Sequence, residues 1–234
     1  MKAFLLAAGK GTRLQPLTLH TPKCLIPIAG RPLIEYWFDL FVHYGIDEVL
    51  INTSYLADTV MEYMKKHSRN LKIRITYESS LLGSGGTVKK NWDFVEEEEF
   101  FFIIYADNLT NINLKKMFES HKQIKMDVTL AVFSVPNPKE CGIVEVDESL
   151  RVVSFTEKPE NPLSNLAFAG IMLSNRTLKD FFPDRDIFDL GFDVLPNTIG
   201  RAAAYIVEDY LLDVGTPEKL KQAEHDVINK VFSI

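Results

Sequence analysis

The sequence contains only two cysteines, Cys24 and Cys141, in 234 residues. They are too few for a disulfide framework or a cysteine-rich zinc site, and their scarcity is typical of proteins from reducing compartments. Long apolar runs are missing as well. Residues 4–8 and 100–106 form the longest, far below the roughly 20 residues that a membrane helix needs. The start of the chain also lacks a secretory cleavage pattern, so we expect a cytoplasmic protein that does not enter the membrane.

Acidic side chains are absent from residues 1–34, although the whole chain carries 32 Asp and Glu against 26 Lys and Arg. The net charge of −6 argues against nucleic-acid binding, which requires clustered basic residues. The acid-free segment nevertheless holds Lys2, Lys10, Arg13, Lys23 and Arg31. A local basic excess in an acidic protein indicates a confined site for a small polyanion, because a concave basic site concentrates its field on an anion.

Strand-like and helix-like segments alternate through the first half of the chain, which is typical of βαβ units around a parallel sheet. The runs 3–8 and 100–105 are continuously apolar, as central strands are. The other elements that we expect are strands at 49–53, 72–77, 128–135, 142–146, 152–156 and 168–173, and helices at 32–44, 55–66, 87–92 and from 216 onward. We therefore predict one α/β domain, residues 1–234, with a mixed central sheet flanked by helices.

A glycine-rich turn, Gly9-Lys10-Gly11-Thr12-Arg13, directly follows the first buried strand. Ligands of open α/β sheets bind beyond the carboxyl ends of the strands, and glycine lets backbone N–H groups approach phosphate oxygens. The turn is neither a dinucleotide fingerprint, which would place glycine at Leu14, nor a P-loop, which would place Ser or Thr after Lys10. It predicts a phosphate site, and the alternative is a tight turn with surface bases.

Two aspartates follow apolar strand-like runs, Asp107 after residues 100–106 and Asp213 after Leu211-Leu212. Carboxylates at strand ends are hard oxygen ligands suited to Mg²⁺, which also binds substrate phosphates. Each aspartate could instead cap a turn. Together with a phosphate loop, the pair predicts a metal-bridged phosphate site.

Several motifs in order resemble the signature of the sugar-1-phosphate nucleotidylyltransferases, which make nucleotide sugars. The first is Leu-Ala-Ala-Gly-Lys-Gly-Thr-Arg-Leu at 6–14, followed by Thr-Pro-Lys at 21–23. The others are Leu-Gly-Ser-Gly-Gly-Thr at 82–87, Asp-Asn at 107–108, Gly-Ile-Val-Glu-Val-Asp at 142–147, Phe-Thr-Glu-Lys-Pro at 155–159, Ala-Gly at 169–170 and Asp-Val-Gly-Thr-Pro at 213–217. The resemblance covers nearly the whole chain and implies a Rossmann-like nucleotidyltransferase fold with a nucleotide-binding half, 1–125, and a sugar-phosphate-binding half, 126–234.

The resemblance implies that the sugar 1-phosphate attacks the α-phosphorus of a nucleoside triphosphate and expels pyrophosphate. Arg13 and Lys23 would then meet the triphosphate, Lys158 the sugar phosphate, and Asp107 and Asp213 would hold Mg²⁺. The nucleotide-binding residues would be Ala8, Gly9, Gly11, Thr12, Glu78, Gly83, Gly85 and Gly86. Gly142, Glu157 and Gly170 would read the sugar hydroxyls, although Glu157 could equally be a salt-bridge partner at a strand end.

The resemblance is strongest to guanylyltransferases for mannose or manno-heptose 1-phosphate and to uridylyltransferases for N-acetylmuramate 1-phosphate. We predict guanylyl transfer to a mannose-type or manno-heptose 1-phosphate, because Glu78 would suit the two donors on one edge of guanine. Glu78 would also suit the single donor of uracil, so uridylyl or thymidylyl transfer is the alternative. Cys24, Ala106 and Phe168 depart from the usual pattern and leave the sugar open. A non-catalytic nucleotide-sugar-binding subunit and a homo-oligomer also stay open. A glycosyltransferase is disfavoured, because Asp107 is not followed by the second aspartate of an Asp-x-Asp pair.

Overall fold

The apolar run near the start of the chain forms strand β1 (Lys2–Leu6) in the computed structural model, which describes residues 1–233. β4 (Glu48–Thr53) pairs with β1 in parallel, and β5 (Lys72–Tyr77) pairs with β4 in parallel. β6 (Phe101–Tyr105) pairs with the other edge of β1. Ala3, Phe4 and Leu5 have no exposed surface, which explains why β1 is apolar on both faces.

The chain forms two compact units from alternating segments. The first unit contains residues 1–81, 104–112 and the chain from 209 onward; the second contains 82–103 and 113–208. β6 therefore starts in the second unit and ends in the first. These units are defined by packing. The nucleotide-binding half, 1–125, and the sugar-phosphate-binding half, 126–234, are defined by the ligands they would bind, so they stay a prediction.

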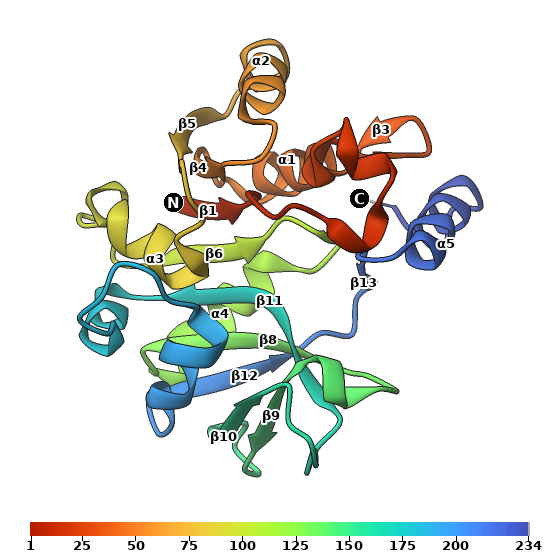
Figure 1. The fold of residues 1–234 in the computed structure, drawn as a ribbon. Helices are drawn as coiled ribbons and strands as arrows, with labels where there is room; N and C mark the ends of the chain where they lie inside the picture. Colours follow the sequence, from red (N-terminus) through yellow and green to blue (C-terminus); the bar gives the residue numbers. More distant parts are fainter. Residues whose placement is uncertain (234) are drawn as a thin grey trace. The chain divides into compact units, whose positions relative to one another are not determined.

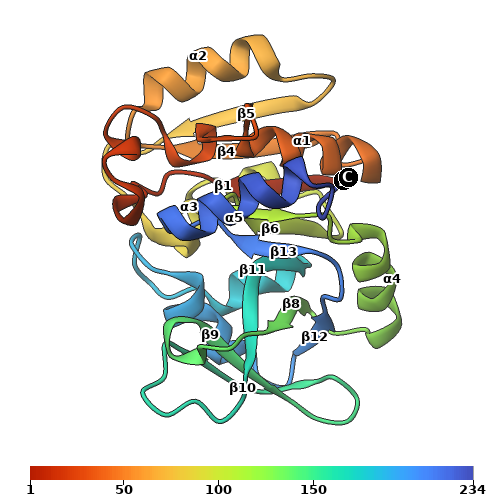
Figure 2. The same ribbon diagram turned by 90° about the vertical axis from the view of Figure 1, so that its right-hand side faces the viewer.

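The helices of the first unit are α1 (Leu33–Tyr44), α2 (Ala57–His67) and α5 (Pro217–Ile228), and Figures 1 and 2 show α2 beside β5. α1 buries a continuous apolar face that includes Trp37, Phe38 and Phe41, and each such side chain stabilises the fold by about 1.5–3 kcal/mol. Gly45 ends α1 in the left-handed conformation, as the sequence predicts.

One buried cluster of the first unit holds together the segments that carry the two strand-end aspartates. It joins Leu33 of α1, Leu109 of β7 (Asn108–Thr110), Val214 after β13 (Leu211–Asp213), and Leu220 of α5. The hairpin of β2 (Pro27–Ile28) and β3 (Arg31–Pro32) adds Ile28. The packing of these segments therefore fixes where β7 and β13 meet.

The second unit is rich in strands. They are β8 (Val128–Ser134), β9 (Gly142–Val146), β10 (Val152–Glu157), β11 (Leu166–Ser174) and β12 (Ala202–Ile206), together with the start of β6. β8 pairs with β11 antiparallel and with β12 in parallel, and Figure 1 shows β8 and β12 side by side although they are distant in the sequence. Antiparallel and parallel pairs together confirm the mixed sheet and the α/β class.

Most strand limits differ from the sequence prediction by one or two residues, and the helix starts differ in ways that matter for the site. The helix expected at 87–92 is α3 (Gly83–Lys90), so the glycine motif is its first turn rather than a loop before it. The helix expected from Tyr55 begins at Ala57, and Pro32 caps α1 from outside instead of standing in its first turn. α4 (Leu114–Ile124) and β12 were not predicted. Within residues 1–233 no helix has the length and apolar character to cross a membrane.

Candidate functional site

Backbone pairing places Asp107 beside Asp213 in the first unit. β7 and β13 run antiparallel with Asp213 opposite Asn108, and the N–H of Val214 donates to the carbonyl oxygen of Asp107 at 2.8 Å. Asp107 lies in the two-residue turn between β6 and β7, and Asp213 is the last residue of β13. The two carboxylates, which lie more than one hundred residues apart in the sequence, thus share one edge of the fold.

Basic side chains from three segments surround this carboxylate pair. The Nζ of Lys23 donates to Oδ2 of Asp107 at 2.8 Å and lies 4.0 Å from Oδ1 of Asp213. Lys219, in the first turn of α5, brings its Nζ to 3.8 Å from Oδ2 of Asp213. A Cβ at Gly215 would lie 2.8 Å from Nη2 of Arg13 and 3.1 Å from both Asp213 oxygens, so glycine at 215 leaves room for the guanidinium beside the carboxylate.

The Asp213 carboxylate has an unsatisfied oxygen. Burial raises its pKa, the neighbouring Asp107 raises it further, and Lys23, Lys219 and Arg13 lower it. Its Oδ1 is buried and has no hydrogen-bond partner among the described residues. A buried carboxylate oxygen without a donor is costly, and a cation would satisfy it. Two carboxylates match what Mg²⁺ takes from proteins when substrate phosphates complete its shell, so the donor set fits this ion.

The glycine-rich turn after β1 lies in the first unit with the carboxylate pair. Gly11 has φ of +61°, and a Cβ there would lie 2.8 Å from Cγ2 of Thr18, so this turn requires glycine. The Thr18 hydroxyl donates to the carbonyl oxygen of Gly11 at 2.9 Å, which fixes the turn. Gly9 has open space around its Cα, and Thr12 and Arg13 are exposed. The turn is therefore rigid where it meets Thr18 and accessible at Gly9, Thr12 and Arg13, while Ala8 is buried.

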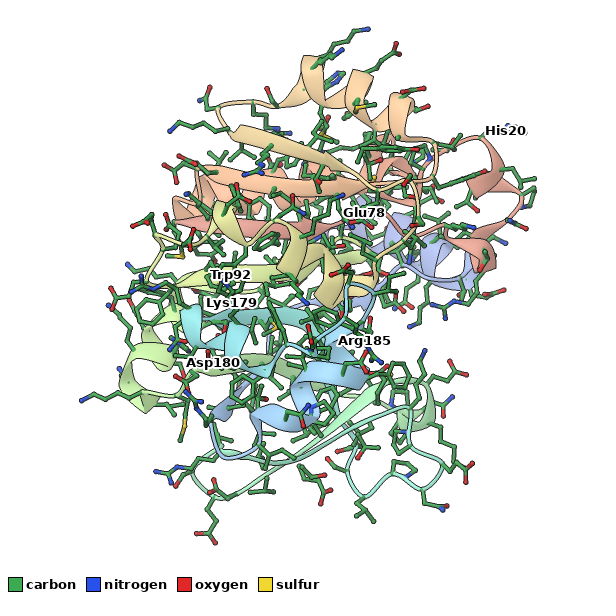
Figure 3. All side chains as sticks on the ribbon, turned by 60° about the vertical axis from the view of Figure 1, so that its left-hand side comes forward. His20, Glu78, Trp92, Lys179, Asp180 and Arg185 are labelled. Atoms are coloured by element: carbon green, nitrogen blue, oxygen red, sulfur yellow. The ribbon has the colours of Figure 1, made fainter. Side chains whose placement is uncertain are left out.

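Asn52, at the end of β4, links this turn to Glu78. Its Oδ1 accepts from the N–H of Ala7 at 2.8 Å, and its Nδ2 donates to Oε1 of Glu78 at 3.0 Å. Glu78 is only 1% exposed, and Figure 3 shows it among closely packed side chains, whereas His20 projects at the periphery of the first unit. Sequence reasoning missed Asn52, although an asparagine that ends an apolar strand is an available signal.

In the second unit, the glycines of α3 lie against the segment around Phe188. The N–H groups of Gly85 and Gly86 both donate to the carbonyl oxygen of Phe188 at 3.1 Å. A Cβ on Gly83 would lie 2.3 Å from that oxygen. A Cβ on Gly85 would lie 2.3 Å from the Phe188 ring, and a Cβ on Gly86 would lie 2.3 Å from the carbonyl oxygen of Asp186. Close packing within the unit therefore already requires these glycines, and their contact with a nucleotide base stays a prediction.

Glu157, at the end of β10, lies in a space that two glycines leave open. A Cβ at either Gly142 or Gly191 would lie 2.6 Å from its Oε2. Burial raises the pKa of Glu157, Lys158 opposes the shift, and Asp189 adds to it. Lys158 is exposed with a positive φ of 49°, and its Nζ lies 6.0 Å from the centre of the Phe192 ring. The structure thus gathers Gly142, Glu157 and Lys158, while sequence reasoning missed Asp189 and Gly191.

Gly170 lies where β11 departs from regular pairing with β8. Its φ is +69°, and the register shifts between Phe168 and Met172.

Cys24, beside Lys23, is buried, and burial raises the pKa of its thiol to about 12, so it carries no reactive thiolate. Within residues 1–233, no group of three or more His, Cys, Asp and Glu side chains is arranged to hold a metal ion without a substrate.

Known proteins resemble this chain along most of its length. Mannose-1-phosphate guanylyltransferase of Mycobacterium tuberculosis is 30% identical over 234 residues, which cover 98% of this chain and 65% of that protein. D-glycero-alpha-D-manno-heptose 1-phosphate guanylyltransferase of Campylobacter jejuni is 31% identical over 219 residues, or 93% of this chain and 96% of that protein. The crystal structure of HddC from Yersinia pseudotuberculosis complexed with GMP-PN matches with a TM-score of 0.82 at 25% identity and covers 97% of this chain and 99% of that one.

The chain spans 55–65% of the length of several curated relatives that it matches. The model of the family described as nucleotidyl transferase matches residues 2–230. This match covers the two strand-end aspartates, the glycine-rich turn and the Glu157 region. It confirms the resemblance that the ordered motifs carry: the chain belongs to the nucleotidyl transferase family of sugar-1-phosphate nucleotidyltransferases.

Proposed function

We propose that this protein transfers a nucleoside monophosphate from a nucleoside triphosphate to a sugar 1-phosphate and releases pyrophosphate. One observation carries the proposal: Asp107 and Asp213 lie together, share Lys23, and leave the buried Oδ1 of Asp213 without a donor from residues 1–233. Such a site suits the transfer between two anions, in which the protein mainly has to position charge and neutralise it.

The reaction needs no nucleophilic side chain, because the sugar phosphate supplies the attacking oxygen. Asp107 and Asp213 would hold Mg²⁺, which would neutralise phosphate charge and orient an in-line displacement. Arg13 would bind the triphosphate and the departing pyrophosphate, and Lys23 would meet the reacting phosphates. The rigid turn at Gly11 would keep the backbone near Gly9 and Thr12 open to phosphate oxygens.

We further propose that the nucleotide is GTP. The amide of Asn52 donates to Glu78, which holds one carboxylate oxygen in place. A carboxylate only accepts hydrogen bonds. Once the base displaces the side chains that now cover Glu78, which is 1% exposed, the carboxylate would match the N1–H and N2–H₂ donors on one edge of guanine better than the single N3–H of uracil or thymine. Two relatives with guanylyltransferase names and the complex of HddC with GMP-PN agree with this choice. Uridylyl or thymidylyl transfer is the alternative.

The acceptor in this proposal is a mannose-type or manno-heptose 1-phosphate. Glu157 would accept hydrogen bonds from sugar hydroxyls, with the backbone at Gly142 and Gly170 beside it, and Lys158 would pair with the sugar phosphate. Gly142 and Gly191 let the backbone pack closely against Oε2 of Glu157, which holds the carboxylate in place and supports this role. We place the reaction in the cytoplasm, where nucleoside triphosphates are available, and assign the protein no membrane or nucleic-acid partner.

The test is a grid of GTP, ITP, UTP, dTTP and ATP against mannose, manno-heptose, glucose and N-acetylglucosamine 1-phosphates, with pyrophosphate release as the readout. We expect GTP to be used best, and ITP, which lacks the N2 amine, at least about tenfold less well, as a lost hydrogen bond to a charged group implies. Glu78→Gln should reduce that preference. Turnover of UTP or dTTP instead would overturn guanylyl transfer, and GTP binding without pyrophosphate release would indicate a non-catalytic subunit.

A further inference from the structure

The segment 186–193 of the second unit contacts both the glycine turn of α3 and the surroundings of Glu157. At its first end, the N–H of Phe188 donates to the carbonyl oxygen of Leu82 at 3.0 Å, and its own carbonyl accepts from Gly85 and Gly86. These bonds lock the segment to the turn through backbone groups. The glycines allow the approach, since any Cβ at 83, 85 or 86 would collide with it.

The Asp189 side chain joins the same turn to the next residues of the segment. Its Oδ2 accepts from the Ser84 hydroxyl at 2.7 Å, and its Oδ1 accepts from the N–H of Gly191 at 2.8 Å and of Phe192 at 3.4 Å. The Ser84 oxygen in turn accepts from the N–H of Leu190 at 2.8 Å. Asp189 therefore caps the π-helical turn Leu190–Val194 and connects it to Ser84 of α3.

The residues that Asp189 caps form one side of the space around Glu157. Gly191 faces Oε2 of Glu157 so closely that a Cβ there would lie 2.6 Å away. The Phe192 ring lies 6.0 Å from Nζ of Lys158. A shift of the capped turn would thus move the wall beside both members of the Glu157–Lys158 pair.

We propose that Asp189 is a positioning residue that fixes the glycine turn of α3 relative to the Glu157–Lys158 pair. The proposal rests on the proposed function, in which a sugar phosphate contacts the pair, and on the contact between the turn and the nucleotide that the family resemblance implies. In-line transfer depends on the separation of the two substrates, and a displacement of about 1 Å can slow such a reaction by about 100-fold. The Asp189 carboxylate would hold that separation without touching either substrate.

The experiment compares Asp189→Ala, Asp189→Asn and, as a matched control, Asp184→Ala at an exposed position of the same unit. We expect Asp189→Ala to lower kcat by about 10- to 100-fold, while GTP and mannose 1-phosphate, measured one at a time, bind within about threefold of the wild type. Asp189→Asn should restore most of kcat, because the amide oxygen can accept from Gly191 and the amide nitrogen can donate to Ser84. Asp184→Ala should match the wild type.

Amide hydrogen exchange gives a readout that does not depend on turnover. In Asp189→Ala, exchange should speed up both at residues 85–86 and at 190–192, and Asp189→Asn should reverse both changes. If Asp189→Ala does not fold, Ser84→Ala, which removes the hydroxyl contacts with Asp189 and Leu190 but leaves those of Asp189 with Gly191 and Phe192, should show the same paired changes at smaller size. Exchange that changes at 190–192 alone, an unaltered kcat, or an Asn variant as slow as Ala would overturn the proposal. If no substrate pair is turned over, the proposed function fails, while paired exchange changes would still support the positioning role of Asp189.

Discussion

The carboxylates at the ends of β13 and β10 are stabilised in different ways. Asp213, in the first unit, lies beside Asp107 and within reach of Lys23, Lys219 and Arg13. Glu157, in the second unit, has glycine backbone on two sides and the Asp189 carboxylate nearby. Burial raises the pKa of both. Basic side chains therefore surround the carboxylate in the first region, whereas glycine backbone packs against the carboxylate in the second.

The difference indicates what each region can bind. A site with two acids and several bases suits a metal ion together with phosphates, because both signs of charge need partners. A partly buried carboxylate packed against glycine backbone suits a ligand with hydroxyl donors, because hydroxyls replace the water that burial removed. The loss of a charge should therefore act mainly on the Asp107–Asp213 region, and an added methyl group mainly on the Glu157 region.

The largest expected effect is that of Asp107→Ala on turnover. Removing one of the two carboxylates proposed to hold Mg²⁺ should lower pyrophosphate release by about 10³-fold, since a bound metal ion contributes several kcal/mol to charge stabilisation. The thermal unfolding temperature should change little, because the backbone pairing of β7 with β13 remains. Asp58→Ala, at an exposed position of α2, is the control and should leave the rate unchanged. Retention of wild-type pyrophosphate release would remove Asp107 from the mechanism.

A methyl group in the second region should act mainly on the sugar phosphate. Gly191→Ala places a Cβ 2.6 Å from Oε2 of Glu157, so that side chain has to move. Overpacking of this kind costs about 1–3 kcal/mol, which corresponds to an increase in KM for the sugar phosphate of about 5- to 150-fold, with KM for GTP nearly unchanged.

A double-mutant cycle identifies the cause of that change. In a Glu157→Ala background the clash disappears, so adding Gly191→Ala should have at most a small further effect on the same KM. Equal effects of Gly191→Ala in both backgrounds would show that the methyl group acts on something other than Glu157.

Lys219→Ala should have a smaller effect, which we expect on the binding of Mg²⁺ beside Asp213. The Nζ of Lys219 lies 3.8 Å from Asp213 at a half-exposed position, so its attraction is worth about 0.2–1 kcal/mol. Without this competing charge, the Mg²⁺ concentration for half-maximal rate should fall by up to about fivefold. Lys221→Ala, also exposed on α5, serves as the control. A higher Mg²⁺ requirement would mean that Lys219 supports the ion rather than competing with it.

The smallest effect concerns stability. Because the pKa of Glu157 is raised in the folded protein, its contribution to stability is fully present below the ordinary pKa of glutamate, ~4.3, and declines as pH rises through the raised value. Glu157→Gln should therefore unfold at higher denaturant concentration than the wild type at pH 7.5, and the difference should shrink toward pH 4. A difference independent of pH would attribute the change to packing.

The sequence predicted the elements that local patterns encode. β5 and β9 have the expected limits, and α1 ends at Gly45 as expected, because apolar periodicity and glycine punctuation depend only on neighbouring residues. The start of α3 was misplaced because Gly83, Gly85 and Gly86 are poor helix formers, and contacts with the segment around Phe188 hold them in a helix. α4 and β12 were missed altogether.

The sequence by itself determined the family, the order of the motifs and the basic character of the acid-free first segment, since residue types at fixed spacing need no third dimension. Only the tertiary structure showed that Lys23 contacts Asp107, that Asn52 connects Ala7 to Glu78, and that Asp189 connects Ser84 to Gly191. These pairs, except for Asp189 with Gly191, join residues at least 26 positions apart along the chain. Hydrogen bonds form across a few ångströms of space, and no local pattern of the sequence encodes which distant side chains folding will bring within that distance.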